Sequence, residues 1–319
     1  MNRDEIADRL NLSGDFFHRA CAKSISDKGW QVLEDVPVAW PPDKPDQKNS
    51  VLDIQATFID EQEGFTTIAI VECEKADPNY KTWFFFPKRF GAKDALVLSV
   101  SALMFRKSDV PILLKIDPNR ARIEQLIGPV SLPSLDPEGK FEDYTCSMGR
   151  EISLQGSKIS QKRIYEACRQ VSIAESSIQY DYQQMLKQEI VPLIRKTPTP
   201  VQELPSPPDG IIKMPIVAFV PVILTTADLK IAKFKEEDVD IRTGKIDPSK
   251  FEYLERDWLI YEYPLPGSQQ RRSHSHLETL VGRDEFRKLH ILVANSLQLE
   301  KFFEGLKQIQ LRPLTTGSS

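Results

Sequence analysis

The stretch VLDIQATFIDEQEGFTTIAIVECEKADPNYKTWFFF, residues 51–86, decides the fold. Apolar and polar residues alternate over 51–59 and again over 65–75, a pattern typical of strands with one buried face. The polar segment between them ends in Gly64, as hairpin turns often do. We therefore predict two antiparallel strands joined by a short turn.

The register of this hairpin brings acidic residues together. With the turn at 61–64, Asp53 falls opposite Glu72 and Gln55 falls opposite Ile70. One face of the hairpin is then polar. It carries Asp53, Gln55, Glu72 and Glu74. The other face is apolar and is expected to pack on a helix; it carries Leu52, Ile54, Ala56, Phe58, Ala69, Val71 and Cys73.

The segments before the hairpin predict a helix and one further strand. Apolar residues recur at helical spacing from Asp15 to Lys28, and Gly29 follows where a C-terminal cap would lie. Residues 30–38 are strand-like and end at a Trp-Pro-Pro sequence. The first part of the chain is therefore predicted to be a helix followed by a three-stranded meander.

The rest of the chain predicts a further α/β region. An amphipathic helix is expected from residue 160 to about 190, followed by a proline-rich stretch that is either a linker or a surface loop. Short apolar runs near 95–103 and 110–116 fit either a helix or a strand. Strands are predicted at 211–224, 229–234, 258–263 and 289–294, and the last of them leads into a final helix at 297–309. The predicted divisions are a core at 1–120, a loop and long helix at 121–195, the proline-rich segment at 196–210, and a C-terminal α/β region at 211–319.

Composition bounds the classes of protein that the chain can belong to. With 319 residues and 40% hydrophobic content, it is long enough for two packed units. The net charge of the whole chain, −4, does not indicate nucleic-acid binding, so any phosphate-binding surface would be a local patch. The four cysteines lie far apart and lack the spacing of a zinc site or a disulfide framework. No apolar run is long enough to span a bilayer, so we expect a cytoplasmic protein without a membrane segment.

The acidic face of the hairpin is a candidate metal site. Glu72 and Glu74 lie two residues apart on one strand, with about 6–7 Å between their Cα atoms, and Asp53 adds a third carboxyl from the neighbouring strand. Carboxylates this close repel one another unless a cation lies among them. Oxygen ligands favour a hard divalent cation such as Mg²⁺ or Mn²⁺.

The same residues resemble a known family. VLDIQA, a turn and AIVECEKADPNYKTWFFF are similar to the PD-(D/E)xK nuclease superfamily, and closely to its bacterial members with a Glu-Cys-Lys strand followed by Trp-Phe-Phe. With the preceding helix and strand, the resemblance covers about residues 14–87. It implies a restriction-endonuclease-like core in the first part of the chain.

The resemblance also implies roles for individual residues. Asp53 and Glu72 would be the metal-binding acids, and the carbonyl oxygen of Cys73 a further ligand. The metal would polarise the scissile phosphate and activate a water molecule for in-line attack. Glu74 occupies the position of the family's lysine, where it would act as a third acid or as a base.

Two positions depart from the family's pattern. Lys75 is the remaining candidate for the catalytic cation, but in a regular strand it faces the apolar side, and only a bulge would turn it inward. On the first helix, His18 stands where the family often has a glutamate. Either departure is compatible with an altered site or with a site that has lost its activity.

Possible substrate contacts are Gln55, Lys81, Lys88 and Arg89. Between residues 80 and 107 there are six basic residues and one acidic residue, interleaved with aromatic residues, as in surfaces that bind phosphate backbones. We expect Trp83, however, to be buried in the core. The segment 269–276, with two arginines and two histidines, is predicted to be a basic loop.

The preferred function is metal-dependent hydrolysis of DNA, in bacterial defence or repair, with the C-terminal region contacting substrate or partner. The alternative is a catalytically degenerate adaptor of the same fold that binds nucleic acid or protein. A purely structural subunit of a larger complex is the third possibility. Because cutting both strands needs two sites, a homodimer is a natural arrangement.

Overall fold

The computed structural model describes residues 2–42, 48–62, 64–88, 96–104, 122–137, 143–153, 158–196, 216–267 and 287–311. Within these residues the chain forms one mixed sheet of 14 strands, a separate two-stranded sheet and few helices. The predicted α/β class is therefore confirmed. In the same residues, no helix combines the length and apolar composition that crossing a membrane would require.

The first part of the chain has the predicted helix and three-stranded meander. Helix α2 (Asp15–Asp27) ends just before Gly29, whose φ of 81° is the left-handed conformation that glycine adopts readily. Strands β1 (Gln31–Ala39), β2 (Lys48–Asp60) and β3 (Phe65–Glu74) then pair antiparallel in sequence order. Gln55 lies opposite Ile70, so the predicted register of the hairpin is confirmed.

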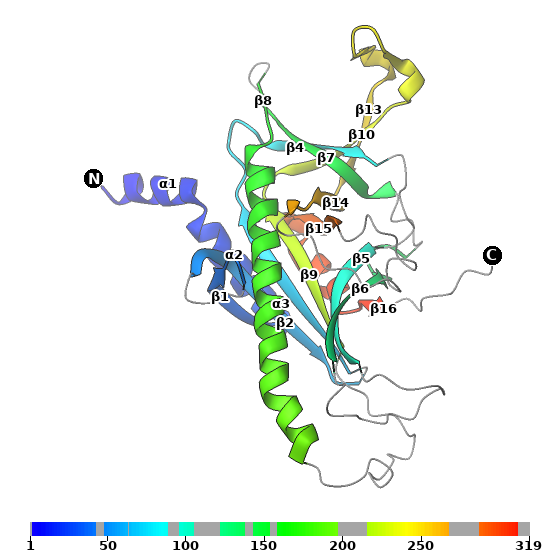
Figure 1. The fold of residues 1–319 in the computed structure, drawn as a ribbon. Coiled ribbons are helices and arrows are strands. Elements are labelled where there is room, and N and C mark those ends of the chain that lie inside the picture. Colours follow the sequence, from blue (N-terminus) through cyan, green and yellow to red (C-terminus); the bar gives the residue numbers. More distant parts are fainter. Residues whose placement is uncertain are drawn as a thin grey trace, which may run out of the picture.

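Helix α1 (Arg3–Ser13) precedes this meander and was not among the predicted elements. The helix begins with a capping box, in which the Asn2 side chain and the Glu5 side chain each accept a hydrogen bond from the other's backbone N–H. Gly14, with a φ of 93°, separates α1 from α2. Figure 1 shows α1 projecting away from the body of the molecule, with the N-terminus at its tip.

Helix α3 (Lys162–Lys196) is the long amphipathic helix that the sequence predicts, and it leads toward the strand beside β3. Strand β9 (Ile216–Thr225) pairs parallel with β3 over ten residues. Because parallel neighbours need a crossover connection, a helix before β9 is the expected arrangement. In Figure 1, α3 runs along the front of the sheet, over β3 and β9.

The remaining strands extend the sheet on the far side of β9. Its main order is β1-β2-β3-β9-β15-β14-β7-β4-β10-β13, while β5, β6 and β16 form a branch that joins at β9. The strands are β4 (Thr82–Pro87), β5 (Leu96–Met104), β6 (Arg122–Ser131), β7 (Thr145–Ile152), β8 (Ile159–Ser160), β10 (Asp228–Lys233), β13 (Glu252–Arg256), β14 (Trp258–Pro264), β15 (Lys288–Asn295) and β16 (Gln310–Leu311).

Strands from the predicted core and from the predicted C-terminal region belong to this one sheet, because β3 lies directly beside β9. A small arm, β11 (Val239–Asp240) and β12 (Lys245–Ile246), extends between β10 and β13 and projects at the upper right in Figure 1. The proline-rich segment and residues 110–116 lie outside the described residues.

Helices cover the two faces of the sheet. On one face, α2 and α5 (Leu299–Leu306) pack with a cluster that contains Trp30, Ile54 and Val71. On the other face, α3 packs through Ile164 to Val171 on Trp83 and Phe85, and through Ile173 to Ile178 on Ile68 and Ile70. Trp83 is fully buried, as predicted. Glu72 and Glu74 lie at the edge of this second face, near the beginning of α3.

Candidate functional site

Asp53 and Glu72 lie where the pairing of β2 and β3 ends. The last recorded pair is Ile54 with Val71, so the next residue on each strand is one of the two acids. The Cys73 N–H donates to Asp53 Oδ2 at 2.7 Å, which holds the Asp53 carboxyl against the backbone of β3. The site is therefore built from the C-terminal end of β3 and the middle of β2.

The strand geometry is irregular at Asp53. Pairing between β1 and β2 passes from Glu34–Ile54 to Val36–Leu52 and omits Asp35 and Asp53. Asp35 has a φ of 53°, which is an unusual conformation for a residue other than glycine. Residues in such conformations are often found at functional sites.

This irregularity overturns one detail of the predicted apolar face. Leu52 packs with Ile68 and Ile70 under α3, whereas Ile54 packs with Ala69 and Val71 on the α2 side. Strict alternation would have placed Leu52 and Ile54 on the same face. The strand therefore changes the direction of its side chains at Asp53.

Glu72 is the most perturbed of the three acids. Burial, reinforced by the charges of Asp53 and Glu74, raises the pKa of Glu72 to about 9. Its Oε2 atom is buried and has no hydrogen-bond partner among the described residues. In the absence of a cation, Glu72 is therefore protonated at neutral pH and one of its oxygens remains unsatisfied.

Glu74 has an environment of a different kind. Burial raises the pKa of Glu74 to about 7, although the nearby Arg163 guanidinium opposes that shift. Arg163 Nη1 lies 3.6 Å from Glu74 Oε2 and donates to the Lys75 carbonyl oxygen at 2.8 Å. Sequence reasoning missed Arg163, because nothing in the local sequence links it to a strand 88 positions earlier.

Asp53 faces the α2 side of the site. Burial raises the pKa of Asp53, while the hydrogen bond from Cys73 and the proximity of His18 lower it. His18 is a buried residue of α2, and its ring nitrogens lie 3.7 Å from Glu34 Oε2 and 3.9 Å from Asp35 Oδ1. Of the three site acids, His18 thus lies close to Asp53.

Lys75 points away from the three carboxyls. Its ammonium donates to the carbonyl oxygen of Asn11 in α1, and its Cβ lies on the side of Gly14. The structure therefore does not bring Lys75 together with Glu72 and Glu74, as expected for a strand without a bulge. The Cys73 side chain also faces α2, where it meets the thiol of Cys21, so only the backbone of Cys73 lies beside the carboxyls.

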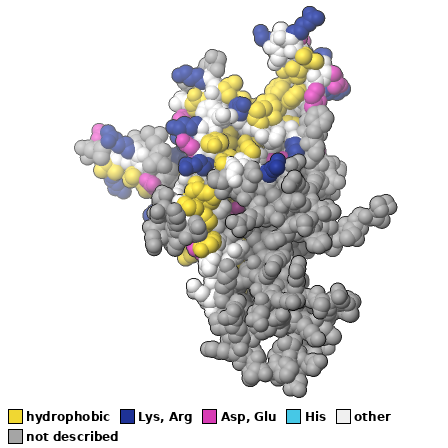
Figure 2. All heavy atoms as spheres, in the orientation of Figure 1, with side chains coloured by type: hydrophobic (Ala, Val, Ile, Leu, Met, Phe, Trp, Pro, Cys, Tyr) yellow, Lys and Arg dark blue, Asp and Glu magenta, His cyan; other side chains and the backbone are white. Residues whose placement is uncertain are grey.

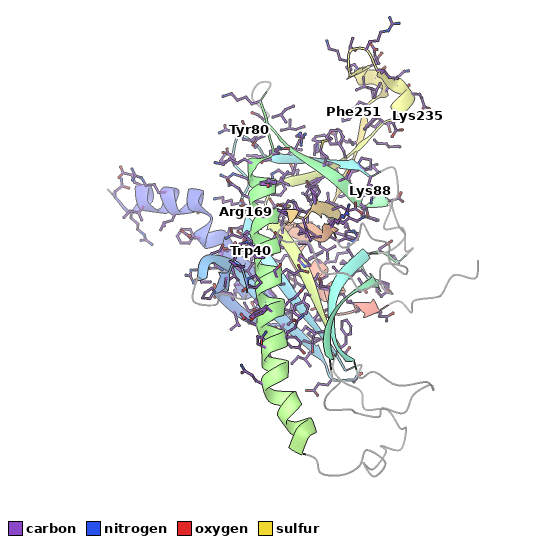
Figure 3. The ribbon with its side chains drawn as sticks, viewed as in Figure 1. Trp40, Tyr80, Lys88, Arg169, Lys235 and Phe251 are labelled. Atoms are coloured by element: carbon purple, nitrogen blue, oxygen red, sulfur yellow. The ribbon has the colours of Figure 1, made fainter. Side chains whose placement is uncertain are left out.

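The predicted substrate contacts are dispersed. Gln55 is half-buried on the face of Ile70, and Lys81 is exposed and immediately precedes β4. Lys88 is bound to Glu262 at 2.8 Å, and Figure 3 shows it well to the right of α3. Arg89 and the loop at 269–276 lie outside the described residues.

A separate cavity among the described residues does not contain the acids. Its volume is about 530 Å³, and it lies between α2 and α5, where Phe17, Cys21 and Leu299 line it. Its lining includes one carboxyl, that of Glu300, and so does not offer the cluster of oxygens found at the end of β3.

The donor set at the acids fits a hard divalent cation in its chemistry. All ligand atoms would be oxygens, from Asp53, Glu72 and the Cys73 carbonyl, and Glu72 Oε2 lacks any other partner among the described residues. No group of three His, Cys, Asp or Glu side chains stands ready to hold a metal within the described ranges. Mg²⁺ commonly needs only one or two carboxylates, because it retains several waters.

Comparison with known proteins adds no assignment. No family model, no curated protein and no solved structure matches the chain. Function therefore has to be argued from the site itself.

The protonation of Glu72 predicts how stability depends on pH without metal. A carboxyl whose folded pKa of about 9 exceeds its usual value of 4.5 keeps a proton that the unfolded chain releases. Its contribution to stability is complete below pH 4.5 and disappears as the pH rises toward 9.

Urea denaturation in a chelating buffer at pH 5, 7 and 9 measures this dependence. Wild-type protein is expected to lose a few kcal/mol more than Glu72→Gln across the range. Identical pH dependence in the two proteins would show that Glu72 ionises normally in the folded state.

Proposed function

We propose that Asp53, Glu72 and Glu74 form the centre of a divalent-metal-dependent phosphodiesterase that acts on DNA. We also infer that α2, β1, β2 and β3 correspond to the restriction-endonuclease-like core that the sequence resembles. The observation that carries the proposal is the gathering of three acids from two strands at one half-buried place. Burial raises the pKa of each acid, and the charge of Asp53 raises the pKa values of Glu72 and Glu74 further.

The proposal assigns a distinct task to each group. Asp53, Glu72 and the Cys73 carbonyl would hold the cation, which when bound supplies Lewis-acid polarisation of the phosphate and lowers the pKa of an attacking water. A cation would also satisfy the lone Oε2 atom of Glu72 and favour its ionised form.

Glu74 is suited to the proton transfer that hydrolysis requires. A base works best when its pKa lies near the working pH, and Glu74 has a pKa of about 7. In the reaction, the water oxygen bonds to phosphorus and the bond to the leaving sugar oxygen breaks. Glu74 takes one proton of the water, and solvent protonates the leaving oxygen.

Cleavage of supercoiled and linear plasmid DNA tests this function. Wild-type protein is expected to nick DNA with Mg²⁺ or Mn²⁺ and to be inactive with a chelator, and conversion of nicked into linear DNA would report a paired site. Failure to cut under any of these conditions, together with undiminished DNA binding, would favour the adaptor that keeps the fold without the chemistry.

A further inference from the structure

Arg163, in the first turn of helix α3, places a positive side chain beside the carboxyls at the end of β3. Within the described part of the chain, Arg163 is the one lysine or arginine that forms an ion pair with any of the three carboxyls. Its guanidinium contacts the Glu74 carboxyl and the Lys75 carbonyl oxygen, in both cases through Nη1. The guanidinium therefore lies across the end of β3 at the acids.

The position of Arg163 is fixed by a buried contact. Glu151 of β7 is 2% exposed, and its Oε1 accepts the Arg163 backbone N–H at 2.8 Å. Ser160 adds a cap to the same helix end, because its hydroxyl oxygen accepts the Lys162 N–H at 3.1 Å. The first turn of α3 is thus anchored to the sheet, and Arg163 is held at a defined place beside the site.

The guanidinium retains capacity for a ligand. Its side chain is 38% exposed, and its Nε and Nη2 atoms have no recorded partner among the described residues. Nε and one terminal nitrogen of arginine form the planar fork that binds two oxygens of a phosphate at once. Figure 2 shows basic side chains around the end of the molecule where α3 begins, so a polyanion would not meet a purely acidic surface there.

We propose that Arg163 binds the substrate phosphate beside the carboxyls, in place of the strand lysine that this chain lacks. This assignment rests on the proposed function. The phosphate gains negative charge at its equatorial oxygens during hydrolysis, and a fixed guanidinium stabilises that charge more strongly than it stabilises the ground state. Arg163 is therefore expected to affect both DNA affinity and the rate of cleavage.

Two measurements on Arg163→Gln test the assignment. The cleavage rate with Mg²⁺ is expected to fall on the order of 100-fold. Binding of a fluorescent DNA duplex, measured by anisotropy with Ca²⁺ at several salt concentrations, is expected to weaken. The negative slope of log K against log salt is expected to become shallower by about 0.9, because one phosphate contact is lost.

Arg169→Gln is the matched control. Arg169 is an exposed residue of the same helix, about 9 Å farther along its axis, and Figure 3 labels it beside the upper part of α3. This variant loses the same charge and is expected to cleave within about twofold of wild type. Equal losses in the two variants would overturn a specific role for Arg163.

Arg163→Lys is the control for the possibility that Arg163→Gln loses activity because it does not fold. It keeps the charge and the helix, but an ammonium cannot form the two-pronged contact, so an unchanged salt slope with about a tenfold lower rate is expected. If the wild type cuts DNA and both Arg163 variants cut it as fast as the wild type does, this assignment is overturned and the proposed function stands. A wild type that does not cut DNA would overturn both.

Discussion

Replacing Glu72 with glutamine is expected to abolish metal-dependent DNA cleavage, by on the order of 10³-fold or more, without loss of the fold. Glutamine has nearly the shape of the protonated carboxyl that burial imposes at Glu72, whose pKa is about 9. It cannot ionise, however, and so cannot offer a charged oxygen to a cation. Activity and stability should therefore change independently.

Nicking rates and urea denaturation at pH 7.5, on the same preparations, measure the two effects. The variant is expected to match or exceed the stability of wild type in a chelating buffer. Glu255→Gln, at a carboxyl of β13 that is 76% exposed, is the control and should leave cleavage unchanged. Cleavage at the wild-type rate by Glu72→Gln would remove Glu72 from the site, and unfolding of the variant would make its role structural.

Removal of the Glu262 carboxyl is expected to cause the largest loss of stability. Lys88 and Lys288 approach it at 2.8 and 3.0 Å, and His290 Nε2 lies 3.3 Å from it. Burial alone would raise the pKa of Glu262, but His290 and the two lysines outweigh burial and lower that pKa to about 2. In Glu262→Ala, two largely buried lysines would lose their counter-charge, at a cost of about 3–5 kcal/mol.

The comparison with an exposed ion pair makes this prediction specific. Glu255→Ala removes the partner of Lys230 at the surface and is expected to cost about 0–1 kcal/mol. Because the folded pKa of Glu262 is depressed, its contribution is present above pH 4.5 and is lost as the pH falls toward 2. Similar losses for Glu262→Ala and Glu255→Ala in urea denaturation would contradict a buried network.

The hairpin that carries the acids could be predicted because its information is local. Alternation of apolar and polar residues, with Gly64 in the turn, sets the pairing of Gln55 with Ile70. The same holds for α2, which Gly29 ends, and for α3, whose apolar positions repeat with helical spacing. The Asn2–Glu5 capping box is an equally local signal, and it marks the start of α1, which was not predicted.

The surroundings of the acids could not be predicted in this way. The left-handed conformation of Asp35 interrupts the alternation of β2, and nothing in the residue types announces it. Arg163 reaches Glu74 only because α3 packs across the sheet and because Glu151, from another strand, anchors the start of α3. Such contacts depend on the pairing of distant segments, which composition and periodicity do not encode.

Calorimetric titration of the wild-type protein with Mg²⁺ tests the central claim most directly, because the claim is that Asp53 and Glu72 hold a cation. At pH 7.5, in two buffers of different ionisation enthalpy, we expect one binding site with release of about one proton, since Glu72 must give up its proton to bind. Glu72→Gln should show neither binding nor proton release. Absence of binding by the wild type, or equal binding by the variant, would contradict the assignment of these carboxyls as a metal centre.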